Sequence, residues 1–334
     1  MHSATGTGPR IRVEVLLDDA DRRAALHETT FWSLRRAPKE LPAVWLYDER
    51  GSVLFEQITR LPEYYPTRRE REILRACAAE IAASTRARTL VELGSGTSEK
   101  TTILLDALAA AGTLERFVPL DASEQVLRAA ALSLGAQYAT LGVHAIVADF
   151  ERHLGALPPG EPRLIAFLGS TIGNLDPERR GRLLAEIAAS LGPSDAFLLG
   201  VDLVKDAGRV HAAYNDPAGV TEAFIRNGLD AVNRQLGANF AQERFSFVAA
   251  WDAVNEWMDI GFCAREPHAV VIPALEVTLE FERDEPLRIE ISSKFRRDGI
   301  ERELARASLR LERWWSDGAG EFALLLARAG AQRS

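Results

Sequence analysis

The spacing of apolar and polar residues divides the chain into regions of different predicted structure. Between residues 89 and 202, short apolar runs alternate with longer segments in which apolar residues recur every three or four positions. Such runs predict strands buried on both faces, and the longer segments predict helices that cover them. The alternation therefore predicts an α/β fold with a parallel sheet. The predicted strands are 90–93, 117–120, 143–147, 164–168 and 196–201, and the predicted helices are 100–111, 124–134 and 177–191.

The residues before this region follow a different pattern. A charged helix is predicted over 18–36, and 69–83 has the apolar face of a helix. Between them, 47–68 contains a glycine, prolines and adjacent tyrosines, which predicts turns. The small and polar residues of 1–10 predict a disordered start.

After Lys205 the pattern changes again. A helix is predicted over 220–236, followed by turn-separated segments that resemble the strands of an antiparallel sheet in an inserted domain. The end returns to α/β character, with a helix over 301–311 and a strand over 322–327 that rejoins the first sheet. The segments of the predicted antiparallel sheet are 245–252, 256–264, 269–272, 277–281 and 287–295.

Composition and charge exclude several classes of function. The chain has 334 residues, 47% of them apolar, which is ample material for one large domain or two smaller ones. Its net charge of -8, without a basic stripe, argues against a nucleic-acid partner. Cys77 and Cys263 match no metal or redox spacing, and the histidines form no H-x-x-x-H pair, so we expect no metal. Without a signal peptide or an apolar run of membrane length, we expect a cytoplasmic protein with no membrane partner.

Lysine is rare in this chain. The sequence holds 36 arginines and four lysines, Lys39, Lys100, Lys205 and Lys294. Such a skew is typical of a coding bias that favours arginine wherever either cation will serve. A lysine that remains is then a hint that a compact ammonium is required.

A glycine-rich turn follows the first strand of the predicted parallel sheet. The segment reads Glu92-Leu-Gly94-Ser-Gly96-Thr-Ser-Glu99-Lys100. Glycines let the backbone turn sharply and approach a ligand closely. A dinucleotide site requires G-x-G-x-x-G, but Glu99 occupies the third glycine position, where its charge would face a pyrophosphate. The turn fits S-adenosylmethionine better, because that ligand carries a sulfonium and an ammonium; a plain strand-turn-helix joint is the alternative.

Acidic residues also stand at the ends of the following strands. In a parallel sheet, ligands bind beyond the carboxyl ends of the strands. Asp121 is placed to accept hydrogen bonds from two ribose hydroxyls, and Asp149 with Phe150 offers an acceptor and an apolar face to adenine. Lys100 is close enough to reach the carboxylate of the methionine part. Each acid alone fits a turn or a helix cap, but the order of glycine loop, ribose acid and adenine acid favours an adenosine-bearing cation.

The methyl acceptor requires polar and aromatic side chains outside this set. Tyrosine and asparagine can orient a zwitterion without adding net charge. Glu290 and Ser292 alternate on a predicted strand and so share one face, where they suit a polar ring. The candidates are Tyr47, Tyr64, Tyr65, Asn174, Tyr214, Glu290 and Ser292.

These motifs resemble those of the histidine-specific N-alpha-methyltransferases of ergothioneine biosynthesis. The resemblance covers about residues 40–328, and its strings are long and in order. They are Tyr47-Asp-Glu-Arg-Gly51-Ser, Ile58-Thr-Arg-Leu-Pro-Glu-Tyr64-Tyr65-Pro66-Thr-Arg68, Glu92-Leu-Gly94-Ser-Gly-Thr-Ser-Glu-Lys100-Thr, Phe167-Leu-Gly-Ser-Thr-Ile-Gly-Asn174-Leu, Leu203-Val-Lys-Asp206, Ala213-Tyr214-Asn-Asp216, Asn255-Glu-Trp257 and Glu290-Ile-Ser292-Ser-Lys-Phe295.

The resemblance implies three successive methyl transfers from S-adenosylmethionine to the α-amine of L-histidine, which give hercynine and S-adenosylhomocysteine. It implies a Rossmann-like domain of 70–203 plus 295–334, and a substrate-binding α+β domain of 11–69 plus 204–294. We expect a monomer. The implied cofactor residues are Gly94, Lys100, Asp121, Asp149 and Phe150.

The resemblance also implies roles on the substrate side. Tyr64, Asn174 and Tyr214 would hold the carboxylate and amine end of the amino acid. Glu290 and Ser292 would bind the imidazole, and Tyr47, with Asn174, would orient the amine.

One position departs from the family pattern and leaves alternatives open. Ile260 stands where the family usually has a methionine beside the imidazole, and isoleucine lacks the adaptable, polarizable thioether. Histidine remains the expected substrate. The alternatives are a related enzyme for tryptophan or tyrosine, an NAD-dependent dehydrogenase, which Glu99 disfavours, and a non-catalytic partner protein.

Overall fold

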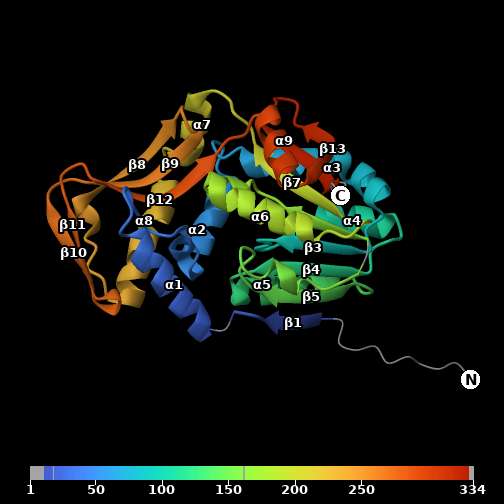
Figure 1. The fold of residues 1–334 in the computed structure, drawn as a ribbon, viewed down its shortest axis with the longest axis horizontal. Helices are drawn as coiled ribbons and strands as arrows, with labels where there is room; N and C mark the ends of the chain where they lie inside the picture. The colour runs from blue at the N-terminus through green and yellow to red at the C-terminus, as the bar shows by residue number, and fades with distance from the viewer. Residues whose placement is uncertain (1–10, 18, 161, 331–334) are drawn as a thin grey trace, which may run out of the picture.

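The computed structural model describes residues 11–17, 19–160 and 162–330, and its largest element is an eight-stranded sheet (Figure 1). The strand order is β1-β5-β4-β3-β6-β7-β14-β13, and the first six of these run parallel. β14 returns antiparallel beside β7, and β13 pairs with it antiparallel. The predicted α/β fold is confirmed, and so is the return of the last strand to the first sheet. The bounds are β1 (Ile11–Val15), β3 (Thr89–Leu93), β4 (Arg116–Asp121), β5 (Gly142–Val147), β6 (Arg163–Phe167), β7 (Ala196–Asp202), β13 (Leu309–Ser316) and β14 (Phe322–Ala329).

Helices cover both faces of this sheet. Every residue of β3, β6 and β7 is buried, because apolar side chains on each face meet a helical layer. One layer is formed by α3 (Pro66–Thr85), α4 (Thr102–Ala110) and α5 (Glu124–Gln137). The other contains α6 (Pro177–Ser190) and α9 (Arg297–Arg306). The strand order reverses direction at β3, so the glycine loop that follows β3 lies where ligands bind in such sheets.

Two expectations about the sheet are wrong in detail. Residues 11–15 form β1 and pair with β5, so this segment joins the large sheet instead of the substrate-binding domain. The helix expected over 301–311 ends at Arg306, because Ser308 adopts a φ of 61° and Leu309 begins β13. The disordered start expected for 1–10 lies outside the described residues.

A second sheet, of order β2-β12-β9-β8, stands beside the first with a buried core of its own (Figure 1). The helix expected over 220–236 is confirmed as α8. The remaining division of the chain into two domains stays a prediction. The bounds are β2 (Lys39–Glu40), β8 (Phe245–Asp252), β9 (Trp257–Ala264), β10 (His268–Ile272), β11 (Val277–Phe281), β12 (Pro286–Ser293), α1 (Asp19–Ser33), α2 (Glu49–Arg60), α7 (Ala207–Tyr214) and α8 (Val220–Leu236), with short 3-10 turns η1 (Ala43–Leu46), η2 (Leu154–Ala156), η3 (Thr171–Asn174), η4 (Gln242–Arg244) and η5 (Pro273–Leu275).

The segment 47–68, expected as turns, contains the helix α2. Asp48 caps its first turn by accepting a hydrogen bond from the Gly51 amide at 2.8 Å. The same carboxylate accepts from Asn227 of α8 at 2.7 Å. Gly51 is required because a Cβ there would lie 1.6 Å from the carbonyl oxygen of Leu46. The turn residues therefore cap a helix that is joined to α8 through Asp48.

A bulge in β12 sets which side chains face the core. Leu287 pairs with Phe262 of β9, but the register shifts between Arg288 and Glu290. Without the shift, Leu287 and Glu290 would lie on opposite faces; the extra residue returns Glu290 to the face of Leu287. Gly261 permits this, since a Cβ there would lie 2.2 Å from the Leu287 carbonyl oxygen. The predicted common face of Glu290 and the serine two residues later is confirmed.

No helix in the described part of the chain is long and apolar enough to cross a membrane.

Candidate functional site

The glycine loop stands at the carboxyl end of β3 and is held by the next strand. Gly94 and Gly96 adopt positive φ angles of 64° and 49°, which side chains disfavour. The Gly96 amide donates to Asp121 Oδ2 at 2.9 Å, and the Ser123 amide donates to Asp121 Oδ1 at 2.9 Å. Burial raises the pKa of Asp121, while these amides oppose the rise. Asp121 thus fixes the loop through both of its carboxylate oxygens.

Phe150 lies against the same loop. A Cβ on Gly94 would stand 3.9 Å from its ring, and the ring packs on Phe167 with centroids 5.1 Å apart. Asp149 precedes it at the end of β5, where its carboxylate accepts the Glu151 amide at 2.8 Å. The structure therefore brings an aromatic face and the glycine turn together.

Lys100 lies in the turn before α4 and is paired with a residue that the sequence did not indicate. Its ammonium donates to the fully buried Glu70 of α3. The second oxygen of Glu70 accepts the Gly169 amide at 2.7 Å. Gly200 of β7 leaves room for this carboxylate, because a Cβ there would lie 2.2 Å from Glu70 Oε1. Glu70 thus joins the turns after β3 and β6.

Buried polar atoms beside the loop lack partners. Thr101 donates to one oxygen of Glu92, but the other oxygen accepts no hydrogen bond from any residue that the structure describes. The hydroxyls of Ser95 and Ser98 are also buried, and neither has a hydrogen-bond partner in the described part of the chain. Burial raises the pKa of Glu92 to about 7. Unpartnered buried groups are costly, so this set fits a polar ligand seated on the loop. The neighbouring Glu99 is exposed and pairs with Arg71 at 3.1 Å.

Aromatic rings gather on the other side of the site. Tyr64 meets Tyr214 edge to face at 6.2 Å, and Phe55 contacts both Tyr47, at 5.8 Å, and Tyr64, at 6.5 Å. Tyr47 keeps 39% of its surface exposed, but its hydroxyl is buried. This burial raises the pKa of Tyr47, and the charge of Glu290 raises it further. Burial likewise raises the pKa values of Tyr64 and Tyr214, so these phenols stay protonated at neutral pH.

Tyr214 and Ser292 form one hydrogen-bonded pair. Their oxygens are 2.7 Å apart, and Lys294 donates to both, at 2.8 and 2.7 Å. Lys294 is completely buried and also contacts Asp202 Oδ2 at 3.0 Å. Burial lowers the pKa of Lys294, and the Asp202 carboxylate opposes that change. The resemblance assigns the pair to opposite ends of the substrate, yet the structure places them in contact.

Asp202, at the end of β7, also organises Tyr65. The Tyr65 hydroxyl donates to Asp202, with oxygen–oxygen distances of 3.0 and 2.9 Å. Lys205 donates to the Tyr65 hydroxyl at 2.8 Å and to the Asp202 carboxylate. This arrangement occupies Tyr65, which is fully buried, and removes it from the candidates for substrate contact.

Glu290 presents a carboxylate oxygen with no partner. Its Oε2 is buried and accepts no hydrogen bond from a described residue. Burial raises the pKa of Glu290 to about 7, against the opposing charge of Lys294. Ile260 pairs with Glu290 across the strands and is 1% exposed. Ile260 and Glu290 are therefore direct neighbours on adjacent strands, and their role beside an imidazole stays a prediction.

Asn174 lies in η3, which packs against β12. A Cβ on Gly173 would stand 2.8 Å from the Ser293 carbonyl oxygen, so glycine permits this close approach. Within the described ranges, no hydrogen bond joins the side-chain amide of Asn174 to another residue. The amide is therefore available to a ligand.

Glu70, Asp202 and Lys294, which bond to residues of the candidate site, were not among the predicted site residues. Glu70 and Asp202 accept hydrogen bonds from Lys100 and Lys294, contacts that only the tertiary structure creates. The one sequence signal was the scarcity of lysine.

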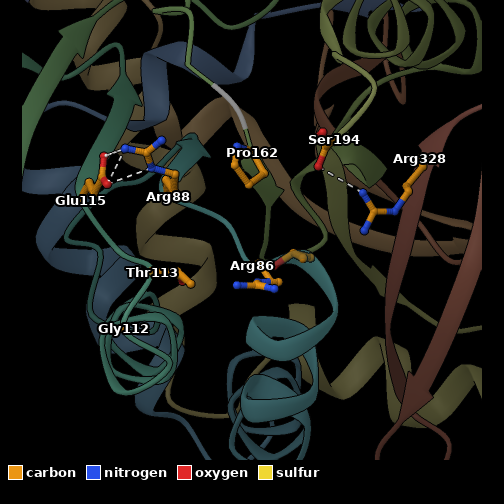
Figure 2. Close-up of a pocket in the computed structure, with 9 residues that line it drawn as sticks. Arg86, Arg88, Gly112, Thr113, Glu115, Pro162, Ser194 and Arg328 are labelled. Atoms are coloured by element: carbon orange, nitrogen blue, oxygen red, sulfur yellow. Dashed lines mark hydrogen bonds and ion pairs between the residues drawn. The ribbon is translucent and has the colours of Figure 1, made fainter.

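A surface depression of about 540 Å³ lies elsewhere, at the amino ends of the strands (Figure 2). Arg88 pairs there with Glu115, and Arg328 donates to the Ser194 carbonyl oxygen at 3.1 Å. The charged groups of this depression are therefore hydrogen-bonded within the protein. The depression lies at the opposite edge of the sheet from the glycine loop. In the part of the chain that is described, no group of three or more His, Cys, Asp or Glu residues is placed to hold a metal ion.

The family described as "Histidine-specific methyltransferase, SAM-dependent" matches residues 26–329. The chain belongs to this family. It is 48% identical to a histidine N-alpha-methyltransferase of Mycobacterium tuberculosis, over 95% of this chain and 99% of the relative. It is 50% identical to a histidine N-alpha-methyltransferase of Mycolicibacterium smegmatis, over 91% of this chain and 94% of the relative. Ergothioneine biosynthesis protein 1 of Neurospora crassa is 32% identical over 90% of this chain and 34% of the relative.

Proposed function

We propose that this methyltransferase converts L-histidine into hercynine by three successive transfers to the α-amine, the first step of ergothioneine biosynthesis. The observation that carries the proposal is Glu290: an unpartnered carboxylate oxygen beside the hydroxyls of Tyr214 and Ser292. An imidazole ring has one N–H to donate and one nitrogen to accept, which such a carboxylate and hydroxyl can satisfy. Family membership and the histidine-methylating relatives support the same substrate.

The glycine loop and its neighbours fit S-adenosylmethionine, which supplies an electrophilic methyl group on a sulfonium. The unpartnered Glu92 oxygen and the hydroxyls of Ser95 and Ser98 suit its polar groups. Asp121 presents its carboxylate to ribose hydroxyls, and Lys100 offers its ammonium to a carboxylate. The residues that would hold the cofactor are Gly94, Lys100, Asp121, Asp149 and Phe150.

Tyr64, Asn174 and Tyr214 would hold the carboxylate and amine end of histidine. Their neutral hydroxyl and amide groups bind a zwitterion without adding charge. Tyr47 and Asn174 would orient the amine lone pair toward the methyl carbon, so most of the rate enhancement would come from positioning. The raised pKa values of the tyrosines keep them from acting as bases at neutral pH. A sulfonium close by lowers the pKa of the substrate ammonium, so its proton leaves without a strong base.

Product analysis tests this proposal. The purified protein is incubated with each of the twenty amino acids and isotopically labelled S-adenosylmethionine, and the products are identified by mass spectrometry. Trimethylated histidine is the expected product, and Glu290→Ala is expected to weaken histidine binding far more than cofactor binding in titration calorimetry. Tryptophan or tyrosine products would support the sister-enzyme alternative instead, and the absence of any methylated product would refute catalysis.

The cellular context is part of the proposal. We propose that the protein acts as a cytoplasmic monomer. Light scattering of the purified protein tests the monomer, with a mass of 36.7 kDa expected.

A further inference from the structure

Lys294 uses its whole hydrogen-bonding capacity inside the protein. An ammonium has three N–H donors. Those of Lys294 go to Asp202 Oδ2 at 3.0 Å, to the Tyr214 hydroxyl at 2.8 Å and to Ser292 Oγ at 2.7 Å. The side chain is completely buried, so none of these bonds is shared with solvent.

The two hydroxyls that receive Lys294 are bonded to each other. Tyr214 and Ser292 carry two O–H protons, and one of these lies in the 2.7 Å bond between them. If Tyr214 donates, the Ser292 proton is left; if Ser292 donates, the Tyr214 proton is left. In either case one O–H remains for a ligand, while Lys294 occupies a lone pair on each oxygen.

The pair therefore presents one O–H and one free lone pair to a ligand. Without Lys294 the same hydroxyls would present one O–H and three free lone pairs, so Lys294 shifts the pair toward donation. Glu290, two residues before Ser292 on the same face of β12, supplies a carboxylate acceptor whose Oε2 has no partner. A neutral imidazole matches one donor and one acceptor.

We propose that Lys294 is a positioning residue that holds the Tyr214–Ser292 pair, so that the Ser292 hydroxyl and Glu290 together select a neutral imidazole while Tyr214 stays at the carboxylate and amine end. The inference rests on the proposed histidine methylation and adds to it a residue that makes no contact with the substrate itself.

The charge of Lys294 also acts on Glu290. Among the described residues, the titratable groups that act on Glu290 or are acted on by it are Lys294 directly after β12, Tyr47 after η1, Tyr64 before α3 and Tyr214 at the end of α7. Lys294 is the one cation in this set, and it opposes the rise of the pKa of Glu290 that burial causes. Its removal therefore raises that pKa further, and a higher pH is required before the carboxylate can accept the imidazole N–H.

Lys294→Met tests the proposal because methionine keeps the length and apolar stem of lysine. The matched control is Lys205→Met, since Lys205 is also largely buried and bonds Asp202 but touches neither Tyr214 nor Ser292. Steady-state kinetics with histidine and calorimetry with S-adenosylhomocysteine are measured from pH 6 to 9.

Lys294→Met is expected to raise the KM for histidine about 10- to 100-fold, to lower kcat much less, and to leave S-adenosylhomocysteine affinity within about twofold. The acid limb of kcat/KM for histidine is expected to move to higher pH in this variant and to stay in place in Lys205→Met. If both variants lose thermal stability but keep the wild-type KM and pH profile, Lys294 is structural and the proposal is overturned.

A second set of variants answers the question if Lys294→Met does not fold. Tyr214→Phe and Ser292→Ala each leave one hydroxyl, whose proton is then free for the ligand, whereas the double variant leaves none. The double variant is expected to lose histidine affinity by about 10-fold more than the product of the single losses. Additive losses would overturn the proposal.

The outcomes separate this inference from the proposed function. If the wild-type protein methylates tryptophan or tyrosine and not histidine, the proposed function has failed. If it methylates histidine and the variants behave as the control does, the role of Lys294 alone has failed.

Discussion

Glu290→Gln should make the free energy of unfolding of the ligand-free protein fall less as the pH rises. Burial raises the pKa of Glu290 to about 7 from an ordinary value of 4.5. Because the folded protein holds this proton more tightly than the unfolded chain, the stability that protonation contributes is complete below about pH 4.5. It is lost as the pH rises through about 7. Glutamine is nearly isosteric and does not titrate, so the variant does not suffer this loss.

The size of the effect follows from the same values. At 1.36 kcal/mol for each pKa unit, ionising Glu290 costs the folded state about 3 kcal/mol relative to the unfolded chain. Part of this cost is already present at pH 5, because the unfolded chain is then largely ionised. Between pH 5 and 8, the free energy of unfolding of Glu290→Gln minus that of wild type should therefore grow by about 2–3 kcal/mol.

Urea unfolding followed by circular dichroism at pH 5, 6, 7 and 8, without histidine, measures this difference. Glu92 has a similarly raised pKa, but it titrates in both proteins and cancels from the comparison. Ser292→Ala is the control, since it changes the same face of β12 without changing a titratable group, and its difference from wild type should not depend on pH. A constant difference between Glu290→Gln and wild type would refute the argument that Glu290 is held in a buried, unpartnered state.

Three further predictions concern the bulge, the cofactor loop and the substrate side chain. Gly261→Ala places a Cβ 2.2 Å from the Leu287 carbonyl oxygen and should lower the free energy of unfolding by about 1–3 kcal/mol in urea denaturation. Gly299→Ala, in α9 with no atom nearer than 4.0 Å, should raise it by about 0.5–1 kcal/mol; equal effects would contradict the steric argument. Lys100→Met should weaken S-adenosylhomocysteine binding about 10- to 100-fold in calorimetry while changing histidine binding less, and unchanged binding would remove Lys100 from the cofactor site. Ile260→Met, a volume-conserving change, should raise kcat/KM for histidine relative to tryptophan, and an unaltered ratio would show that this position does not select the side chain.

The sequence was sufficient to predict the central sheet because its strands are apolar on both faces and its helices are long. The predictions that are wrong concern segments whose local sequence pattern is weak and whose structural partners lie far away along the chain. Residues 11–15 form β1 only because the edge of β5 is available to them. The segment 47–68 resembles turns in sequence because its capping residues are turn residues, yet it contains α2, whose capping residue Asp48 bonds Asn227 of α8.

The residues at the site also fall into two groups, those that the sequence could locate and those that it could not. Asp121, and Phe150 against Gly94, stand where strand ends in a parallel sheet must place them, so spacing alone located them. Glu70 was not predictable, because it lies on the helix α3, away from any strand end, and reaches Lys100 only across the fold. The bulge at Arg288–Glu290 has no signature in the alternation of β12, although it decides that Glu290 faces inward.

Lysine scarcity was the one compositional feature that pointed to these hidden contacts, and the structure supplies its physical reason. Lys100 meets a carboxylate that is fully buried, while Lys205 and Lys294 share Asp202, which is 1% exposed. Lys294 must direct three N–H groups from one atom to three different elements, β7, α7 and its neighbours on β12. A guanidinium is planar and spreads its donors over a wider fork, so it cannot reproduce this convergence in the same volume. In a chain that otherwise uses arginine, lysine is retained at these three positions where the geometry demands a point charge, and one of them, Lys294, supports Tyr214 and Ser292, which are proposed to bind the substrate.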